Sequence, residues 1–573
     1  PKKQAAVLEV LRARAAPMTR DELAAASGCT QAPIAALRRK GLIASQVQRV
    51  SRGPVEEPPP PDEDFLDLNE AQQEAFQRIS EALRGGRHET ILMHGVTGSG
   101  KTEVYMHAIR EVVRYGRQAI VLVPEISLTP QTVARFRKRF GTVAVLHSHL
   151  SDAQRHRYWE QIASGSVPVI VGARSAVFAP TPHLGLLVID EEHEYSFKQE
   201  TAPRYHAREV ARQRAEDERI PLVLGSATPS LESYHHAGEG RYTLLQLPHR
   251  VENRPLPAVH TIDLRDQLDH RSTRGAISRP LHTAIQQALD EEGQVILLLN
   301  RRGFSTHIQC PSCGQAVRCP SCEIALTHHK QAWQAVCHYC DYRQKVPDRC
   351  PHCNFAGMRY RGQGTQKLEE EVRARFPHST CLRMDTDSMQ RAGSHESALD
   401  RFRRGEVQIL LGTQMIAKGL DFPNVTLVGV INADTALHLP DFRAEERTFQ
   451  LLTQVAGRTG RGPRGGHVLV QTLQPDHPAI RAAVAHDYAA FAHYELPNRK
   501  LLGYPPWGAM IRLVVRSRQP DDGLMLAQQL ADALRDAGDA QRVGVRVAGP
   551  APAPFAKLRG KYRFALQVLG AEV

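Results

Sequence analysis

The chain has 573 residues, 42% of them hydrophobic, and its 73 Lys and Arg residues outnumber 61 Asp and Glu residues, which gives a net charge of +12. No run approaches the roughly 18 apolar residues of a membrane span, and Pro1 is neither an initiator Met nor the start of an apolar signal peptide, so we expect a soluble cytoplasmic protein whose natural sequence begins earlier. The basic balance favours a polyanionic partner, most often nucleic acid, although many large proteins are mildly basic.

Residues 1–53 predict two or three short helices followed by a strand. Thr19 can cap the second helix, which carries Leu23, and a glycine turn leads into a third helix with a basic end. With the strand-like segment 42–50, this is the pattern of a winged-helix domain, and a small structural helical bundle fits equally well. The Pro-rich segment 54–66 predicts an exposed linker.

Two stretches of alternating apolar strands and amphipathic helices follow, at 67–268 and 269–485. Such alternation predicts α/β folding, with parallel sheets covered by helices on both faces. A change in composition predicts a last α/β domain at 486–573, which ends in a strand-like segment and is therefore expected to be cut short. The expected strands are 90–95, 119–123, 184–190, 222–226, 295–299, 407–412 and 425–431.

A phosphate-binding loop is predicted between the first of these strands and the helix after it. Its eight residues match the pattern GxxxxGK[ST], and the flanking strand and helix are the context that the pattern requires. Backbone N–H groups of such a loop wrap the phosphates of ATP, Lys101 neutralises the β- and γ-phosphates, and the Thr102 hydroxyl ligates Mg²⁺. The loop residues are Gly95, Val96, Thr97, Gly98, Ser99, Gly100, Lys101 and Thr102.

Acidic residues end the strand 184–190. Asp190 is expected to hold Mg²⁺, and Glu191 to polarise the attacking water as a general base. An acidic cluster after a strand is by itself usually a solvated loop, and the preceding phosphate loop makes a catalytic role more favourable. Gln72, upstream of the loop, can bond to the adenine edge, and a surface glutamine is the alternative.

With these residues the chain resembles superfamily-two helicases, whose motor has two RecA-like lobes. The segment GSATP at 225–229 resembles the motif that couples ATP state to the grip on DNA, and 412–422 resembles the second-lobe motif that touches DNA and nucleotide. QVAGRTGR at 454–461 resembles the arginine-finger motif, and such a finger is worth roughly 10³–10⁵ in rate. The resemblance implies catalysis by Arg458 and Arg461 and nucleotide contacts by Gln454, Gly419 and Asp421.

A closer resemblance, covering essentially the whole chain, is to the PriA family of replication-restart helicases. Its marks are DEEH at 190–193, VPEISLT at 123–129, NRRG at 300–303, GQGT at 362–365 and a zinc insertion. The resemblance implies an ATP-dependent 3′→5′ DNA helicase that remodels stalled forks for primosome assembly. The implied partners are forked and single-stranded DNA, primosome proteins and single-strand-binding proteins. The family's N-terminal domain that captures 3′ ends is not recognised ahead of the winged-helix pattern.

Eight of the ten cysteines form four CxxC pairs within 309–355. Four pairs predict two Cys₄ zinc sites, which are structural because no ligand position is left open, and a redox CxxC is the disfavoured alternative. Spacing does not fix which pairs share an ion. The resemblance implies a nested arrangement, with the outer two pairs at one site, and sequential pairing is the alternative. The expected ligands are Cys310, Cys313, Cys319, Cys322, Cys337, Cys340, Cys350 and Cys353.

Aromatic and basic residues interleave directly after the DEEH segment. Phe197, Lys198, Tyr205 and Arg208 are candidates for contact with single-stranded DNA, because rings stack on bases and cations meet phosphates. The segment resembles the aromatic-rich loop by which PriA-like motors link DNA binding to ATP hydrolysis. The alternative is that these rings pack within the lobe.

Two other functions are compatible with the sequence. Helicase motifs settle neither polarity nor sugar preference, so an RNA helicase or a double-strand translocase could use the same motor. A fork-binding scaffold that uses little ATP is the second alternative, and the complete set of catalytic candidates disfavours it.

Overall fold

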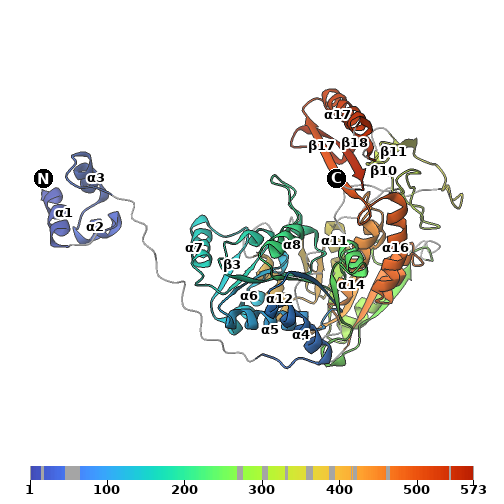
Figure 1. Ribbon diagram of the computed structural model, residues 1–573. Coiled ribbons are helices and arrows are strands. Elements are labelled where there is room, and N and C mark those ends of the chain that lie inside the picture. The colour runs from blue at the N-terminus through green and yellow to red at the C-terminus, as the bar shows by residue number, and fades with distance from the viewer. Residues whose placement is uncertain are drawn as a thin grey trace. The chain divides into compact units, whose positions relative to one another are not determined.

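The structure is a computed structural model (Figure 1), and two compact units, residues 1–57 and 58–573, make up the chain. No helix within the described ranges is long and apolar enough to cross a membrane. The described residues are 2–14, 18–45, 65–266, 275–299, 308–329, 333–356, 365–385, 394–413, 416, 422–459, 465–540 and 544–571.

Three helices form the described part of the first unit, around a small core that includes Leu37. Thr19 caps the second helix as predicted, because its side chain and N–H exchange hydrogen bonds with Glu22 in a capping box. Residues 41–45 contain no strand and 46–50 lie outside the described residues, so the winged-helix domain stays a prediction. The helices are α1 (Lys2–Ala13), α2 (Arg20–Ala26) and α3 (Gln31–Arg39).

The first lobe of the second unit is built on a parallel seven-stranded sheet in the order β3-β4-β2-β5-β6-β1-β7. The four strands predicted here all form within a residue of their expected bounds. Their apolar runs are continuous because both faces of the sheet are covered. The strands are β1 (Glu89–Gly95), β2 (Gln118–Leu122), β3 (Val143–Leu146), β4 (Val169–Gly172), β5 (Leu184–Asp190), β6 (Pro221–Ser226) and β7 (Thr243–Leu247).

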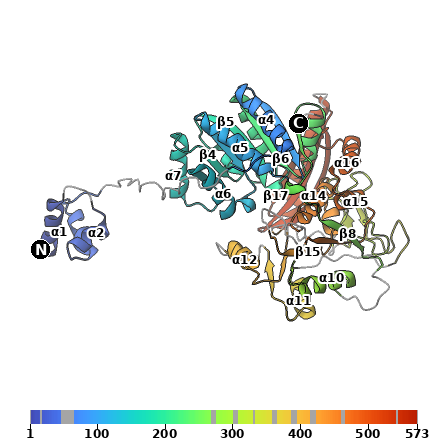
Figure 2. The same cartoon turned by 90° about the horizontal axis from the view of Figure 1, so that it is seen from below.

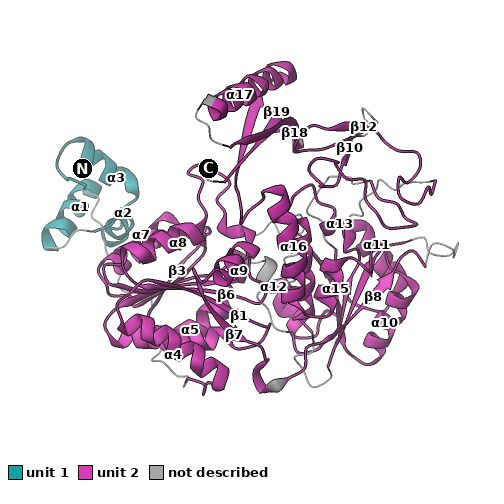
Figure 3. Ribbon diagram, turned by 45° about the vertical axis from the view of Figure 1, so that its right-hand side comes forward, with its two compact units in different colours: residues 1–57 teal, residues 58–573 magenta. Residues whose placement is uncertain are grey.

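Helices cover both faces of this sheet (Figure 3). One face packs against α4, α5 and α6, and the other packs against α7 and α8. The helices are α4 (Glu70–Arg84), α5 (Lys101–Arg114), α6 (Pro130–Phe140), α7 (Asp152–Ala163), α8 (Ala207–Asp217) and α9 (Leu231–Gly238). The short 3₁₀ helices are η1 (Glu125–Ser127), η2 (Arg174–Phe178), η3 (Tyr195–Phe197) and, after β7, η4 (Val251–Asn253).

The second lobe has a parallel six-stranded sheet in the order β13-β14-β9-β15-β16-β8 (Figure 2). Its edge strand β8 pairs with β16, so this sheet begins before residue 269, where the second lobe was expected to start. The chain crosses to the second sheet soon after β7, so the boundary between the lobes lies earlier than predicted. The strands are β8 (Ala258–Asp263), β9 (Gln294–Leu298), β13 (Cys381–Met384), β14 (Ile409–Gly412), β15 (Val425–Val430) and β16 (His467–Thr472).

Helices also cover both faces of the second sheet, with α10 and α11 on one side. On the other side, α16 contributes Tyr488 and Phe491 to the core of this lobe, although the C-terminal domain was expected from residue 486. The helix therefore belongs to the second lobe by packing. The helices are α10 (Arg279–Asp290), α11 (Thr365–Arg375), α12 (Ser394–Arg403), α13 (Asp434–Leu437), α14 (Ala444–Ala456), α15 (Pro478–Val484) and α16 (Tyr488–Leu502).

The cysteine-rich insertion and the C-terminal sheet lie side by side in Figures 1 and 3. A hydrogen bond of 2.6 Å between His338 Nδ1 and Pro552 O joins them. Each has a three-stranded antiparallel sheet, in the orders β10-β11-β12 and β17-β19-β18. The elements are β10 (Thr327–His329), β11 (Gln334–Val336), β12 (Arg343–Lys345), β17 (Ala509–Ser517), α17 (Pro520–Ala540), β18 (Arg546–Leu558) and β19 (Lys561–Gly570).

Candidate nucleotide site and metal centres

The turn between β1 and α5 forms the predicted phosphate loop. Gly98 and Gly100 both have a φ of 81°, a left-handed conformation that glycine adopts without strain. Lys101 is buried, and its Nζ donates to Gly95 O at 2.7 Å and to Val96 O at 3.3 Å. The carbonyl groups of the loop therefore hold the ammonium group that the sequence predicts to meet the phosphates.

Gln72 reaches the loop from α4. Its Nε2 donates to Ser99 O at 2.8 Å, and its Oε1 accepts from Asn69 N at 3.0 Å as part of a capping box. A Cβ at Gly100 would lie 2.2 Å from Gln72 Nε2, so any other residue there would displace this side chain. Both ends of the Gln72 amide thus bind backbone groups, and its contact with adenine stays a prediction.

The predicted catalytic carboxylates lie at the end of β5. The Tyr105 hydroxyl donates to Asp190 Oδ1 at 3.4 Å, and burial, with a contribution from Glu191, raises the pKa of Asp190 to about 6. Glu191 has a φ of 50°, which is uncommon for a residue other than glycine. Thr102, the other expected Mg²⁺ ligand, lies in the first turn of α5. The backbone strain at Glu191 is typical of residues held in place by a functional site.

His193, the last residue of the DEEH segment, connects the two lobes. Its Nδ1 lies 2.7 Å from Ser226 Oγ in the GSATP segment, and its Nε2 lies 2.8 Å from Gln454 Nε2 on α14. Because the Gln454 amide donates to Nε2, a neutral His193 carries its proton on Nδ1 and donates it to Ser226. The sequence placed His193 in a motif without giving it a role, because its partners are distant along the chain.

The predicted arginine-finger segment lies against the phosphate loop. Gly457 follows α14, and a Cβ there would lie 2.7 Å from Thr97 Cγ2 and Oγ1. Gln454 and Arg458 are both buried in the same region. The structure thus brings the start of this segment to the loop. The remaining second-lobe candidates lie outside the described residues, and their roles stay predictions: Gly419, Asp421 and Arg461.

The connector between the lobes is the chain that leads from the end of β7 to β8. It is also hydrogen-bonded to the phosphate loop, which the sequence did not indicate. Val96 N donates to Leu247 O at 3.2 Å, and Val251 N donates to Gly98 O at 3.0 Å. Arg250 is buried beside them, and a Cβ at Gly98 would lie 3.3 Å from its Nε. The chain that continues into β8 therefore leaves the first lobe in direct contact with this loop.

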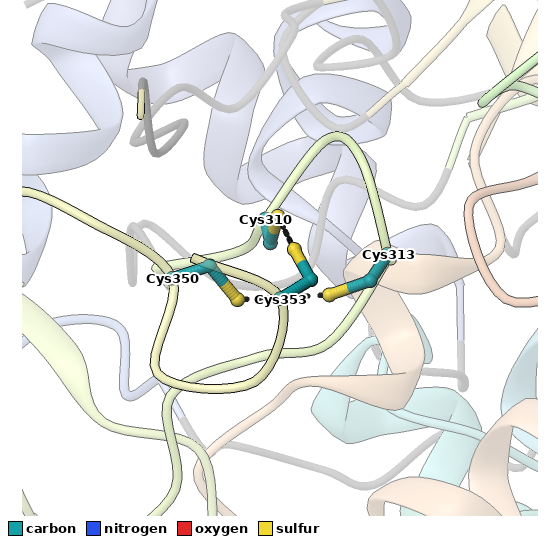
Figure 4. Close-up of side chains that lie close together, drawn as sticks. All are labelled: Cys310, Cys313, Cys350 and Cys353. Carbon is teal, nitrogen blue, oxygen red and sulfur yellow. Dashed lines mark hydrogen bonds between the residues drawn. The ribbon is translucent and has the colours of Figure 1, made fainter. Parts of the chain in front are cut away.

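The eight cysteines form two groups in which the Sγ atoms all lie within 4.8 Å of one another. This is the nested arrangement that the family resemblance implied. Within these groups, three pairs of Sγ atoms are 3.5, 3.6 and 3.6 Å apart. These distances are close to the roughly 3.8 Å edge of a tetrahedron with Zn–S bonds of about 2.3 Å. Both groups therefore fit a tetrahedral metal ion. The outer group (Figure 4) is Cys310, Cys313, Cys350 and Cys353, and the inner group is Cys319, Cys322, Cys337 and Cys340.

All four CxxC pairs share one turn geometry. In each, the first cysteine donates its N–H to a carbonyl five residues later and accepts, through its own carbonyl, an N–H four residues later. The residue that donates this second bond has a positive φ in every turn. Glycine occupies only the first of these positions, so the sequence signals one turn of the four. The four residues and their φ values are Gly314 (74°), Glu323 (55°), Asp341 (61°) and Asn354 (59°).

The segment after DEEH is less accessible than a DNA contact requires. Phe197 is 1% exposed and lies in the core of the first lobe. The Arg208 guanidinium donates to a Glu192 carboxylate oxygen at 2.8 Å, and Tyr205 packs edge-on against Phe178 with ring centroids 5.0 Å apart. These contacts favour the alternative that the aromatic side chains pack within the lobe, and DNA contact stays a prediction.

Tyr195 is the exposed aromatic residue of this segment. Tyr195 is 48% exposed, and the Arg447 guanidinium of α14 lies 5.1 Å from the centroid of its ring. Lys198 is half-buried and forms a β-bridge with His206. Composition alone did not separate Tyr195 from Phe197, since burial depends on the direction in which η3 leaves β5.

Family models match three parts of the chain: DEAD/DEAH box helicase at 69–237, helicase conserved C-terminal domain at 324–463, and primosomal protein N C-terminal domain at 500–572. The replication restart protein PriA of Bacillus subtilis (strain 168) is 45% identical over 95% of this chain and 67% of the relative. The proteins of the same name from Synechocystis sp. and Haemophilus influenzae are 42% and 40% identical, over 99% and 93% of this chain and 68% and 72% of the relatives. The chain belongs to the PriA family.

Membership of the PriA family, together with the two helicase domains, makes the chain an ATP-dependent DNA helicase of replication restart. The activity that the motifs predicted is thereby confirmed, and neither an RNA helicase nor a scaffold with little motor activity is supported. The two RecA-like lobes predicted for this PriA-family motor are the two parallel sheets. ATP is accordingly the nucleotide that the site between β1 and α14 has to accommodate.

Proposed function

We propose that the chain moves 3′→5′ along DNA and remodels stalled or abandoned forks, so that the primosome can assemble. The observation that supports this proposal is the single site that both lobes build. His193 and Gln454 meet across the lobes at 2.8 Å, and Gly457 lies against Thr97 of the phosphate loop. A site assembled from two lobes changes when either lobe moves, as a translocating motor requires. Polarity and the role at forks are supported by the family resemblance.

Each part of this site has a proposed task in ATP hydrolysis. Lys101 leaves the Gly95 carbonyl to neutralise the β- and γ-phosphates, and Arg458, with Arg461, stabilises the charge that develops on the γ-phosphate. Mg²⁺, when bound, supplies further neutralisation of the phosphates, and Thr102 and Asp190 are the side chains that would hold it.

Glu191 is proposed to orient the attacking water. Its Oε2 is buried and has no hydrogen-bond partner in the part of the chain that the structure describes. His193 Nδ1, which donates to Ser226, lies 3.7 Å from this oxygen. An acceptor without a donor is available to take the proton of a water molecule, which is the geometry that a general base needs.

Two zinc ions are proposed for the cysteine groups, with a structural role because four thiolates complete the coordination of each ion. The expected partners are forked and single-stranded DNA, single-strand-binding protein and primosome proteins, encountered in the cytoplasm. Within the segment after DEEH, base contact is proposed through Tyr195, because its ring is exposed, and phosphate contact through the neighbouring half-buried Lys198.

A strand-displacement assay tests polarity. Duplex DNA with a single-stranded 3′ tail, the same duplex with a 5′ tail, a fork, and the 3′-tailed substrate made of RNA are each incubated with ATP. We expect displacement of the 3′-tailed DNA and of the fork, and none of the RNA. Faster displacement of the 5′-tailed duplex would overturn the proposed polarity. Lys101→Ala serves as the control for displacement that does not depend on ATP.

A further inference from the structure

A cluster of charged side chains, several of them buried, joins the two lobes beside the GSATP segment, outside every motif. Glu232 lies in the first turn of α9 in the first lobe, and Arg443 Nη2, at the start of α14 in the second lobe, is 2.5 Å from its Oε1. Arg499 of α16 lies between three carboxylates, with Nη2 2.7 Å from Glu446 Oε2, Nε 3.1 Å from Glu495 Oε1 and Nη1 4.0 Å from Glu232 Oε1. Charges from three helices thus converge on the start of α9.

The backbone between GSATP and α9 is held by the same helices. Glu446 Oε1 accepts from Leu231 N at 3.0 Å, and the Tyr488 hydroxyl donates to Pro229 O at 2.8 Å. The first N–H groups of a helix have no partner within it, so a carboxylate from the second lobe caps a helix of the first. The first lobe is therefore held at the end of the segment whose Ser226 contacts His193.

Burial makes these contacts consequential. Arg499 is 1% exposed, and the Glu232 and Arg443 side chains are 13% and 35% exposed. Burial alone would raise the pKa of Glu232, but the guanidinium groups of Arg443, Arg499 and Arg208 outweigh it and hold the pKa below its usual range. Removing one partner of such a pair leaves an uncompensated charge, so the ion pair favours the arrangement in which it is made.

The two arginines are held in place from a third direction. The Phe442 ring lies under both guanidinium groups, 4.2 Å from Arg443 and 5.1 Å from Arg499. Phe442 in turn stacks on Tyr504 at 4.8 Å, and its N–H donates to the Tyr339 hydroxyl at 3.3 Å. Tyr339 lies in the inner CxxC turns, so the cysteine-rich insertion contributes to the placement of Arg443.

We infer that Glu232, Arg443 and Arg499 form an interlobe latch that positions α14, so that Gln454 at its far end reaches His193 and Gly457 reaches the phosphate loop. Arg443 and Arg499 are then positioning residues for ATP hydrolysis, since neither lies in the nucleotide site. The inference rests on the proposed two-lobe site and is independent of polarity. One rigid helix carries the latch at its start and the nucleotide contact at its end.

A double-mutant cycle on the interlobe pair tests the latch. Glu232→Gln, Arg443→Gln and the double variant are compared for DNA-stimulated kcat and for the KM for ATP. Each kcat is taken per binding site, counted by titration with a fluorescent ATP analogue. We expect each single variant to lose about fivefold in kcat and the double variant to lose no more than either, because both remove one interaction. Glu239→Gln, at the exposed C-cap of α9, is the matched control and should leave kcat unchanged.

Each other outcome decides against the latch. Losses that multiply in the double variant would show two independent roles, and single variants with wild-type kcat would show none. A lower melting temperature with fewer binding sites, but unchanged kcat per site, would show a purely structural role. Gln454→Ala separates the underlying site from the latch. Full activity of that variant would overturn the two-lobe site, whereas its loss together with active Glu232→Gln would overturn the latch alone.

Discussion

The cysteine-rich insertion and the segment 195–208 were both predicted to be functional from their residue patterns. The structure brings the predicted residues together in the insertion but buries or pairs most of them in the segment. In the insertion, spacing identified the cysteines that gather, and the four turns bring them together as two groups of four that could each hold a metal ion. In the segment, residue type indicated DNA contact, but Phe197 is 1% exposed and Arg208 is paired with Glu192. A pattern of spacing constrains the backbone locally, whereas composition leaves open which way a side chain points. Predictions that rest on spacing are therefore the stronger ones.

The phosphate loop gives the most severe test of a prediction from spacing. Lys101→Ala removes the ammonium group that the loop carbonyls hold, so we expect ATP turnover to fall by at least about 10³, the lower end of what a charge on the transferred phosphate contributes. DNA binding should be largely retained, since strand contact uses another surface. Steady-state ATPase and DNA-binding assays measure both. Turnover within about tenfold of wild type, or a barrier change of only ~1.4 kcal/mol, would show that Lys101 is not the phosphate lysine.

The insertion gives the next largest effect. Elemental analysis should find two zinc ions per chain, and Cys313→Ser should leave one while Cys319→Ser removes the other, because the two residues belong to different groups. Removal of both ions by a chelator should lower the melting temperature, since metal binding is coupled to folding in sites of this kind. Cys29→Ser, outside both groups, is the control. A single variant that loses both ions, or a wild-type chain with one, would contradict the nested arrangement.

In the aromatic segment, substitution of two nearby residues, Phe197 and Tyr195, distinguishes packing within the lobe from contact with DNA. Phe197→Ala should lower the free energy of unfolding by about 3–5 kcal/mol, as for other truncations of a buried Phe. Tyr195→Ala, at a ring that is 48% exposed, should leave stability unchanged and weaken the stimulation of ATPase by single-stranded DNA. Thermal melting and the ratio of stimulated to basal ATPase are measured on both variants. If Phe197→Ala is as stable as wild type but loses stimulation, the original DNA-contact prediction is restored.

The smallest expected effect concerns a carboxyl group that neither spacing nor composition marked. Burial, which outweighs the nearby Arg499, raises the pKa of Glu495 to about 7. The folded chain then keeps a proton that the unfolded chain releases near pH 4.3, so the contribution of Glu495 to stability is complete below that pH and is lost as the pH rises through about 7. Glu495→Gln should remove this loss. Melting curves of both proteins from pH 5 to pH 8 should converge at low pH and diverge at high pH, and parallel curves would contradict the shift.

The helices and strands of this fold could be predicted from the sequence more fully than the surfaces against which they pack. The strand β5 has the bounds that its apolar run indicated, and the other predicted strands differ by two residues or fewer. The sequence did not place β8 or α16 with the second lobe, because periodicity reveals an element but not the surface on which it packs. For the same reason it missed His193 and the pair of Glu232 with Arg443. These contacts join residues far apart in the chain, and only the folded lobes bring them together.

The hydrogen bond from Val251 N to Gly98 O gives the motor a property that its motifs do not convey. Gly98 belongs to the nucleotide loop, and Val251 belongs to the connector between the lobes. The hydrogen bond therefore fixes the start of the connector to the loop. A shift of this loop on nucleotide exchange would act through this hydrogen bond on the chain that leads to the second lobe. The connector is therefore fixed to the nucleotide loop at its start, and is not merely a flexible linker between the lobes.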